Sequence, residues 1–324
     1  MKRIFEWQPY TDERRQIWDD FVQTSDNGVI FHTRRFLSYH SHDRFCDASA
    51  EVFKNGKLFA VLPAVAVEQN GRRALISHQG ASYGGFAYNS ALNLKEAFEL
   101  ADILEERALS LNCSRIQLTL PPFIYQDNFS NYIDFALIQK KYSYLKRELS
   151  SAVALFPDTN KMLAHYRIEA RAAASKSERA GVEIAECDRF EEYYEILKEN
   201  LKMRHCVTPT HSLDELLLLK RLFPAKIRLW GAFLGDKLIA GVCNFTVNPR
   251  VVLAFYISHD EKYQEFRAVN LLFREIMKRA AAEGFTWLDF GIFTVNMEPN
   301  WGLARFKENF GARGIFRDTF VKDL

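Results

Sequence analysis

The sequence predicts an α/β (α+β) protein of two related halves, each a mixed, mostly antiparallel twisted sheet flanked by helices. Three observations predict this class. The same hairpin pattern occurs once in each half, an amphipathic helix and a short strand follow each copy, and the composition is globular, with 48% hydrophobic and 26% charged residues. Because a domain usually holds on the order of 100–200 residues, the 324 residues allow one large or two medium domains. The repeated pattern favours two, at 1–155 and 156–324.

The hairpin pattern is the clearest sign of an internal repeat. Residues 50–67 read AEVFKNGKLFAVLPAVAV, which is two apolar runs separated by Asn55-Gly56. Asn-Gly between two such runs is a strong hairpin signal. Residues 229–247 read LWGAFLGDKLIAGVCNFTV, with Gly235-Asp236-Lys237 as the turn. Chance similarity between two generic α/β stretches is the alternative explanation.

Each hairpin leads to a further strand, a helix and a last short strand. The further strands are expected at 73–77, running on to the Gly-rich segment 80–86, and at 251–258. In each helix, apolar residues recur at three- and four-residue spacing and form one buried face. These faces comprise Ala97, Leu100, Ala101, Leu104, Ala108 and Leu111 in the first half, and Val269, Leu272, Phe273, Ile276, Met277 and Ala280 in the second. With short strands at 115–120 and 286–290, the order indicates a duplicated β-β-β-α-β unit.

Three further helices are expected between the two copies. Residues 160–181 are rich in Ala, Arg, Glu and Lys, which favour a helix, and Gly181 can end it. A second helix is expected at 189–203 and a third at 212–222. Ser212 and Glu215 have the spacing of a capping box at the start of the third helix.

Composition and charge exclude several classes of protein. A net charge of +2 gives no field that points to DNA. We expect neither a secretory signal, because the first residues lack an apolar run, nor a transmembrane helix, because no stretch of about 18–20 apolar residues occurs. The five cysteines are widely spaced and form no CxxC pair, so we expect free thiols, no metal site and a cytoplasmic location.

The second half resembles a known superfamily. Residues 233–242, FLGDKLIAGV, resemble the central hairpin of GNAT and Fem-type transferases. Asp289-Phe290-Gly291 and residues 302–312, GLARFKENFGA, resemble the DFG…GLxxFKxxFG ending of the Fem-type fold. The similarity covers about residues 160–320, and the first half shares only the order of elements and the hydropathy. This resemblance implies two tandem GNAT-like domains that transfer an acyl or aminoacyl group to an amine.

The resemblance also implies the donor. GNAT members use acetyl-CoA, whose pyrophosphate is held by backbone N–H groups in a loop of the form Q/R-x-x-G-x-G/A before a helix. Fem-type members use aminoacyl-tRNA and a cell-wall precursor. Here the loop reads Gln264-Glu265-Phe266-Arg267-Ala268-Val269, so Arg267 and Val269 replace the glycines and are expected to crowd a diphosphate. Arg267 can instead contact phosphate through its side chain, and with Asn270 and Lys307 it forms the expected donor-binding set.

Three residues are candidates for the acid–base chemistry of amine acylation. Asp289 ends an expected strand and can accept a proton from the amine, or can simply cap the next loop. Tyr256 is expected to share a strand face with Ala254 and Ser258, and can line the cleft or be structural. His205 lies in a polar loop and can act as a base, because histidine titrates near neutrality, or can be merely solvated.

The expected acceptor-binding residues come from both halves. Tyr83, Gly84 and Gly85 offer a ring and an approachable backbone, although a plain turn explains them equally well. Arg204 and His211 lie in a loop of the second half, where binding residues are common.

The leading functional hypothesis is an acyltransferase that acylates an amine on a cell-envelope or polysaccharide precursor. It needs no permanently bound cofactor, and acyl-CoA, such as acetyl-CoA, is the expected co-substrate. Aminoacyl-tRNA is the alternative donor, and a catalytically silent binding module is the alternative class. A hydrolase is set aside because the sequence has no GxSxG motif.

Overall fold

The computed structural model describes residues 3–41, 43–69, 71–205 and 208–324, apart from the side chains of residues 204 and 205. The chain divides into two compact units. Unit 1 comprises Met1–Glu148 and Phe316–Leu324, and unit 2 comprises Leu149–Ile315. The expected boundary at residue 155 differs from this division, which falls within one strand. The last residues belong to unit 1 because their strand pairs with a strand of that unit, Thr319 opposite Thr119.

The strands of unit 1 form two sheets. Four strands have the order β1-β3-β4-β7 and are antiparallel: β1 (Phe5–Pro9), β3 (Ala50–Lys54), β4 (Lys57–Leu62) and β7 (Ala87–Tyr88). The strands of the second sheet have the order β17-β8-β6-β5-β2, in which β6 and β8 are parallel. They are the end of β17 (Arg313–Asp323), β8 (Arg115–Thr119), β6 (Arg72–Ser77), β5 (Val65–Gln69) and β2 (Cys46–Asp47). β9 (Ser143–Ala154) begins in unit 1 and continues in unit 2.

The hairpin expected in unit 1 is confirmed. Its turn is Asn55-Gly56, both with positive φ (51° and 73°), between β3 and β4. The second apolar run is not one strand, however. It breaks at Pro63, and β4 and β5 lie in different sheets, since proline has no N–H to donate to a continuing ladder.

The helices of unit 1 cover these sheets and complete its core. They are α1 (Arg15–Thr24), α2 (Arg34–Leu37), α3 (Leu94–Ser110) and α4 (Tyr132–Gln139), with short 3-10 turns at Asp12–Arg14, Ile30–His32 and Phe123–Tyr125. The expected apolar face of α3 is confirmed, because Ala97, Leu100 and Leu104 are fully buried in the main core cluster.

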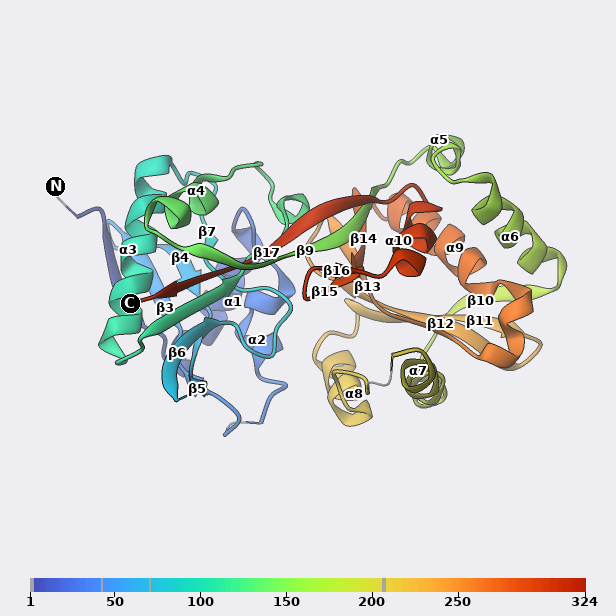
Figure 1. Cartoon of the computed structure of the whole chain (residues 1–324), viewed down its shortest axis with the longest axis horizontal. Helices are drawn as coiled ribbons and strands as arrows, with labels where there is room; N and C mark the ends of the chain where they lie inside the picture. Colours follow the sequence, from blue (N-terminus) through green and yellow to red (C-terminus); the bar gives the residue numbers. More distant parts are fainter. Residues whose placement is uncertain (1–2, 42, 70, 206–207) are drawn as a thin grey trace. The chain divides into compact units, whose positions relative to one another are not determined.

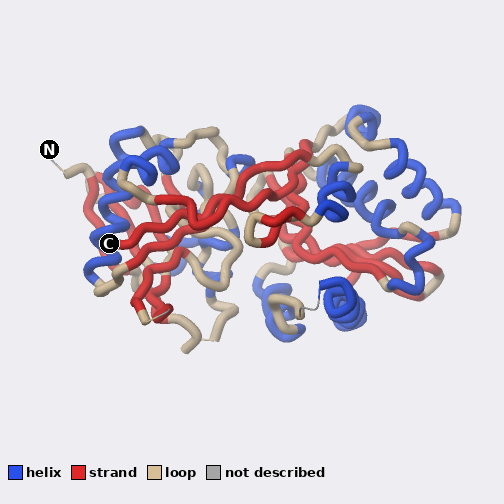
Figure 2. Tube along the Cα trace, viewed as in Figure 1, coloured by secondary structure: helices blue, strands red, loops and turns tan. Residues whose placement is uncertain are grey.

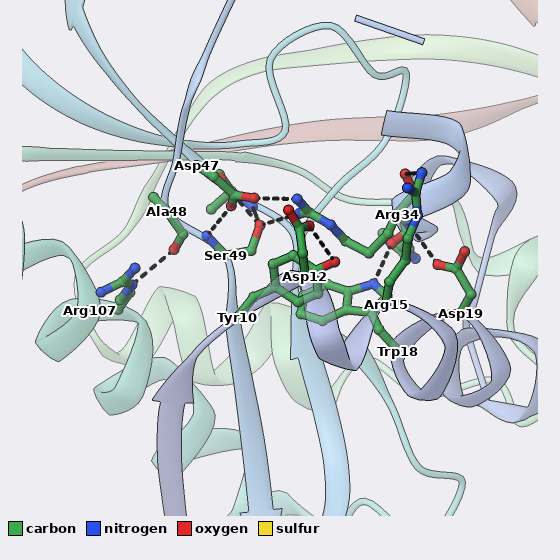
Figure 3. Close-up of polar contacts among 12 residues, drawn as sticks. Tyr10, Asp12, Arg15, Trp18, Asp19, Arg34, Asp47, Ala48, Ser49 and Arg107 are labelled. Carbon is green, nitrogen blue, oxygen red and sulfur yellow. Dashed lines mark hydrogen bonds and ion pairs between the residues drawn. The ribbon is translucent and has the colours of Figure 1, made fainter. Parts of the chain in front are cut away.

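A partly buried arginine joins α2 to the sheets of unit 1 (Figure 3). The guanidinium of Arg34 lies 3.9 Å from the ring centroid of Tyr10 and also faces the ring of Trp18. It donates to Ser49 Oγ (2.9 Å) and pairs with Asp47. This side chain therefore ties helix, strand and aromatic core together.

The main sheet of unit 2 has helices on both faces (Figure 1). Its strand order is β10-β11-β12-β13-β14-β9, with β13 and β14 parallel and the other neighbours antiparallel. The strands are β10 (Val182–Cys187), β11 (Ile227–Leu234), β12 (Lys237–Thr246), β13 (Val251–His259) and β14 (Trp287–Ile292), and β15 (Thr294–Val295) and β16 (Glu298–Pro299) form a separate pair. The hairpin expected at Gly235-Asp236 is confirmed between β11 and β12.

The helices of unit 2 are drawn in blue in Figure 2, and their bounds match most of the sequence expectations. They are α5 (Thr159–Ala164), α6 (Ile168–Arg179), α7 (Phe190–His205), α8 (Leu213–Leu222), α9 (Ala268–Ala282) and α10 (Trp301–Glu308), with a 3-10 segment at Glu261–Phe266. The helix expected over 160–181 is two helices, α5 and α6. The capping box is confirmed, with Ser212 Oγ accepting from Glu215 N–H (3.1 Å).

Candidate functional site

A cavity of about 530 Å³ opens in unit 2 where α9 begins. Its walls come from α7, the end of β13, the segment before α9 and the start of α10. The lining residues are Asn200, Ile257, His259, Tyr263, Gln264, Arg267, Ala268, Val269, Asn270, Asn300, Gly302, Leu303 and Phe306. Nearly half of them carry apolar or aromatic side chains, and these stand beside amides and one arginine, a mixture typical of small-molecule sites.

The divergence of two parallel strands creates space beside the cavity. β13 and β14 pair only as far as Leu253 opposite Asp289. Beyond that point β13 continues to His259. Among the described residues, this last part of β13 pairs with β12 alone. Ile257 and His259, which line the cavity, belong to this extension. Backbone groups along this edge of β13 therefore have no ladder partner in β14, although the carbonyl of His259 accepts from Asn200 Nδ2 (3.3 Å).

Arg267 shapes the segment that leads into α9. Its backbone is in the left-handed region (φ 57°, ψ 29°), where glycine is favoured. Its N–H donates to Gln264 O (3.1 Å), and its carbonyl accepts from Asn270 N–H (3.0 Å). The loop thus takes the backbone conformation that a glycine usually provides, although the residue is arginine.

The electrostatics of the cavity favour an anion. The positive end of the α9 dipole lies at Ala268 and Val269, both of which line it. Within the described part of the chain, the guanidinium of Arg267 has no ion-pair partner and the lining includes no carboxylate. A phosphate in the cavity would supply the missing partner.

The structure places two of the three expected donor-binding residues at the cavity. Arg267 and Asn270 both line the cavity, as does Val269, which was expected on the buried face of the helix. Lys307 does not line it and is 2% exposed. Its Nζ donates to the carbonyls of Gly291 (2.6 Å) and Ile292 (2.8 Å) at the end of β14.

Asp289 lies in the same buried cluster as Lys307. It is fully buried and accepts from Ser150 Oγ (2.7 Å) and Gly291 N–H (2.7 Å). Burial lowers the pKa of Lys307 to about 7, and the nearby Asp289 carboxylate opposes that shift. These two side chains hold the end of β14, and the catalytic role expected of Asp289 stays a prediction.

The side chain of Tyr256 lies on a different face of β13 from the one that strict alternation of side chains along the strand predicts. A bulge leaves Phe255 without a direct partner between the pairs Cys243–Tyr256 and Asn244–Ala254. Ala254 therefore packs in the core beneath α9, whereas Tyr256 contacts His211. The expected common face for Ala254 and Tyr256 is wrong, because the inserted residue reverses the alternation.

His211 and Tyr256 form a buried pair outside the cavity lining. His211 N–H donates to Tyr256 Oη (3.1 Å), and His211 Nδ1 lies 2.8 Å from the same oxygen. Tyr194 Oη donates to the carbonyl of His211 (3.0 Å). Burial raises the pKa of Tyr256, so its phenol stays protonated at neutral pH. The side chains of Arg204 and His205 lie outside the described part of the chain, so their expected roles stay predictions.

The Tyr83-Gly84-Gly85 segment is packed into unit 1. The Tyr83 ring is 3% exposed and lies between those of Phe31 and Tyr125. Gly84 O accepts from His32 Nε2 (3.0 Å), and a Cβ on Gly84 would collide with the backbone of Ser77. The structure gives these residues packing contacts, and acceptor binding by them stays a prediction.

Sequence reasoning did not single out several residues that line the cavity. Asn200 and His259 carry no local motif, because one comes from a helix and the other from a strand end. Asn300 does carry a signal, since its side chain accepts from Leu303 N–H (3.0 Å) as the N-cap of α10. Phe306 lies beside Lys307 in the motif, on the cavity side of α10.

Comparisons with known proteins concern the family of the second half and the fold of the chain. Residues 161–308 match the family model described as an acetyltransferase (GNAT) domain. No curated protein sequence matches the chain. Among solved structures, FemX has a TM-score of 0.76 at 12% identity, covering 98% of this chain and 97% of that one. A tandem GNAT protein from the clavulanic acid biosynthesis pathway has a TM-score of 0.56 at 11% identity, covering 98% of each chain.

A further neighbour is L-PGS from Bacillus licheniformis, with a TM-score of 0.59 at 11% identity, covering 96% of this chain and 91% of that one. Among the described residues, no helix is long and apolar enough to span a membrane. No group of His, Cys, Asp or Glu side chains among them could hold a metal ion. Residues 161–308 therefore match a GNAT domain, and the whole chain has a fold similar to those of FemX and of a tandem GNAT protein.

Proposed function

We propose that the unit 2 cavity binds an acyl-CoA donor, and that the protein transfers the acyl group to an amine of a cell-envelope or polysaccharide precursor. The observation that carries this proposal is the loop at Arg267. It has the left-handed backbone of a glycine-type pyrophosphate loop, a helix N-terminus behind it and an arginine without an ion-pair partner among the described residues.

The chemistry follows from the donor. The amine attacks the thioester carbonyl, the C–N bond forms, and the C–S bond breaks so that the thiolate leaves and takes up a proton. The open edge of β13 offers backbone N–H groups to the carbonyl oxygen as negative charge develops on it. Asp289 and Lys307 act on the shape of this edge by holding the end of β14 away from β13.

The decisive experiment measures binding of CoA and acetyl-CoA by calorimetry to the wild type and to Arg267→Gly. Glycine accepts the left-handed backbone, so this change removes the guanidinium and leaves the loop conformation possible. A charge-assisted contact to phosphate is worth about 1.5–3 kcal/mol, so we expect affinity to fall about 10- to 100-fold. Arg221→Ala, an exposed arginine of α8 outside the cavity, is the matched control and should bind like the wild type.

Two other outcomes have defined meanings. If CoA does not bind the wild type but an aminoacyl-tRNA analogue does, the donor is the Fem-type one. One observation favours a catalytically silent module as second candidate: Asp289, Tyr256 and Lys307 are not among the residues that line the Arg267 cavity. Donor binding without turnover of any amine would support that candidate.

A further inference from the structure

A second cavity, in unit 1, is built around a buried carboxylate. It measures about 430 Å³ and lies where the end of α1, β7 and the segment before α4 meet. Its lining residues are Asp26, Tyr88, Ser90, Leu92, Asn128, Phe129, Ser130, Asn131 and Tyr132. All nine belong to unit 1, and the family match covers none of them.

Asp26 has an incomplete set of partners. Its side chain is almost fully buried, at 4% exposure. Oδ1 accepts from the backbone N–H (3.1 Å) and the side-chain Nδ2 (2.6 Å) of Asn128. Oδ2 is buried and has no hydrogen-bond partner among the described residues, and Asp26 forms no ion pair with any of them.

Such an arrangement needs a physical reason, because a buried charged group without compensation costs free energy. Protonation of Oδ2 would not remove the cost, because the new O–H group would lack a hydrogen-bond acceptor just as the oxygen now lacks a donor among the described residues. The backbone holds Asp26 in place, since its N–H donates to Tyr88 O and its carbonyl accepts from Asp127 N–H (both 2.8 Å). The carboxylate itself cannot rotate without breaking its two hydrogen bonds to Asn128.

The rest of the lining suits a cation. Tyr88, Phe129 and Tyr132 contribute three aromatic rings, whose faces attract positive charge. Among the described residues, the lining includes no lysine, arginine or histidine. The negative charge of Asp26 also acts on Tyr88, whose pKa is raised, first by burial and then by this carboxylate.

We propose that this cavity binds a small organic cation that carries an ammonium group. The carboxylate of Asp26 supplies the countercharge, and the rings of Phe129 and Tyr132, which are 63% and 43% exposed, form the outer wall. The ammonium does not need to touch Oδ2, because at low effective dielectric a charge several ångströms away is still strongly attracted. The site is independent of the donor cavity proposed for unit 2.

Calorimetric titration of the full chain with choline tests the proposal. Its uncharged carbon isostere, 3,3-dimethylbutan-1-ol, has the same shape without the charge, and ethylammonium tests a primary amine. We expect saturable choline binding at about 1–10 mM, and no saturable binding of the isostere. Asp26→Asn should weaken choline binding at least about tenfold, and Phe129→Ala about two- to fivefold.

The controls separate this site from the rest of the protein. Asp20→Asn removes an exposed carboxylate of α1, and Arg267→Gly alters only the donor cavity, so both should bind choline like the wild type. If Asp26→Asn fails to fold, Phe129→Ala and Tyr132→Ala carry the test, because neither residue is buried. Equal binding of choline and its isostere, unchanged binding by the folded variants, or no saturable binding of either ammonium ion up to about 50 mM would overturn the proposal.

Discussion

Lys307 is expected to make the stability of unit 2 depend on pH over the neutral to alkaline range. Burial lowers its pKa from 10.5 to about 7 in the folded protein, whereas the unfolded chain keeps the ordinary value. Between these two values the unfolded state binds more protons than the folded state, so the free energy of unfolding rises with pH. The contribution is complete above about pH 10.5 and is lost as the pH falls to about 7.

The size of this effect follows from the shift. Each pKa unit corresponds to about 1.36 kcal/mol, so the interval from pH 7 to 9.5 gives at most about 3.4 kcal/mol. The carbonyls of Gly291 and Ile292 accept from Nζ and favour the ammonium form, which opposes part of the shift. We therefore expect a rise of about 2–3 kcal/mol across this interval.

The assay compares guanidinium unfolding of the wild type and Lys307→Met at pH 7 and 9.5, followed by circular dichroism. Methionine has a similar length and no charge, so the pH-dependent part of stability should be absent in this variant. Lys237→Met, at an exposed position in β12, controls for the other groups that titrate in this range. A wild type and a Lys307→Met variant that gain equally on alkalinisation would refute the reasoning.

Two predictions concern unit 1. Burial lowers the pKa of His32 to about 4, and its neutral ring accepts from Val29 N–H and donates to Gly84 O. Because the unfolded chain binds the proton more readily, the free energy of unfolding should fall by about 2–3 kcal/mol from pH 6.5 to 4.5. Thermal unfolding at these two pH values should show a smaller fall in stability for His32→Gln than for the wild type. Arg34→Lys should lower the free energy of unfolding by about 1–3 kcal/mol, because lysine cannot stack on Tyr10 and bond Ser49 and Asp47 at the same time. Arg35→Lys, at the exposed neighbouring position, should leave the free energy of urea unfolding unchanged. Equal effects of the two substitutions would contradict the stabilising role of Arg34.

Much of the fold could be predicted because its signals are local. Asn55-Gly56 requires positive φ at two successive residues, and few other pairs adopt that turn. The capping box at Ser212 and the apolar faces of α3 and α9 also depend on residues within a few positions of one another. Such patterns are readable without knowing what they pack against.

The errors came from features that depend on distant residues. The bulge at Phe255 is visible only in the pairing of β13 with β12, and no turn residue marks it. The pairing of the C-terminal strand with unit 1 is likewise set by which partner that strand finds. The sequence showed that Arg267 replaces a glycine, but not that arginine would adopt the glycine conformation.

Asp289 of the Asp289-Phe290-Gly291 motif and Lys307 of GLARFKENFGA have a physical explanation in the divergence of β13 from β14. When two paired strands separate, backbone groups that the ladder would have satisfied lose their partners. Here Asp289 accepts from the N–H of Gly291, and Lys307 donates to the carbonyls of Gly291 and Ile292. These two buried side chains replace sheet hydrogen bonds where β14 leaves β13. We therefore expect replacement of Asp289 or Lys307, neither of which lines the cavity beside α9, to weaken CoA binding measured by calorimetry through a changed course of β14, without loss of a direct contact.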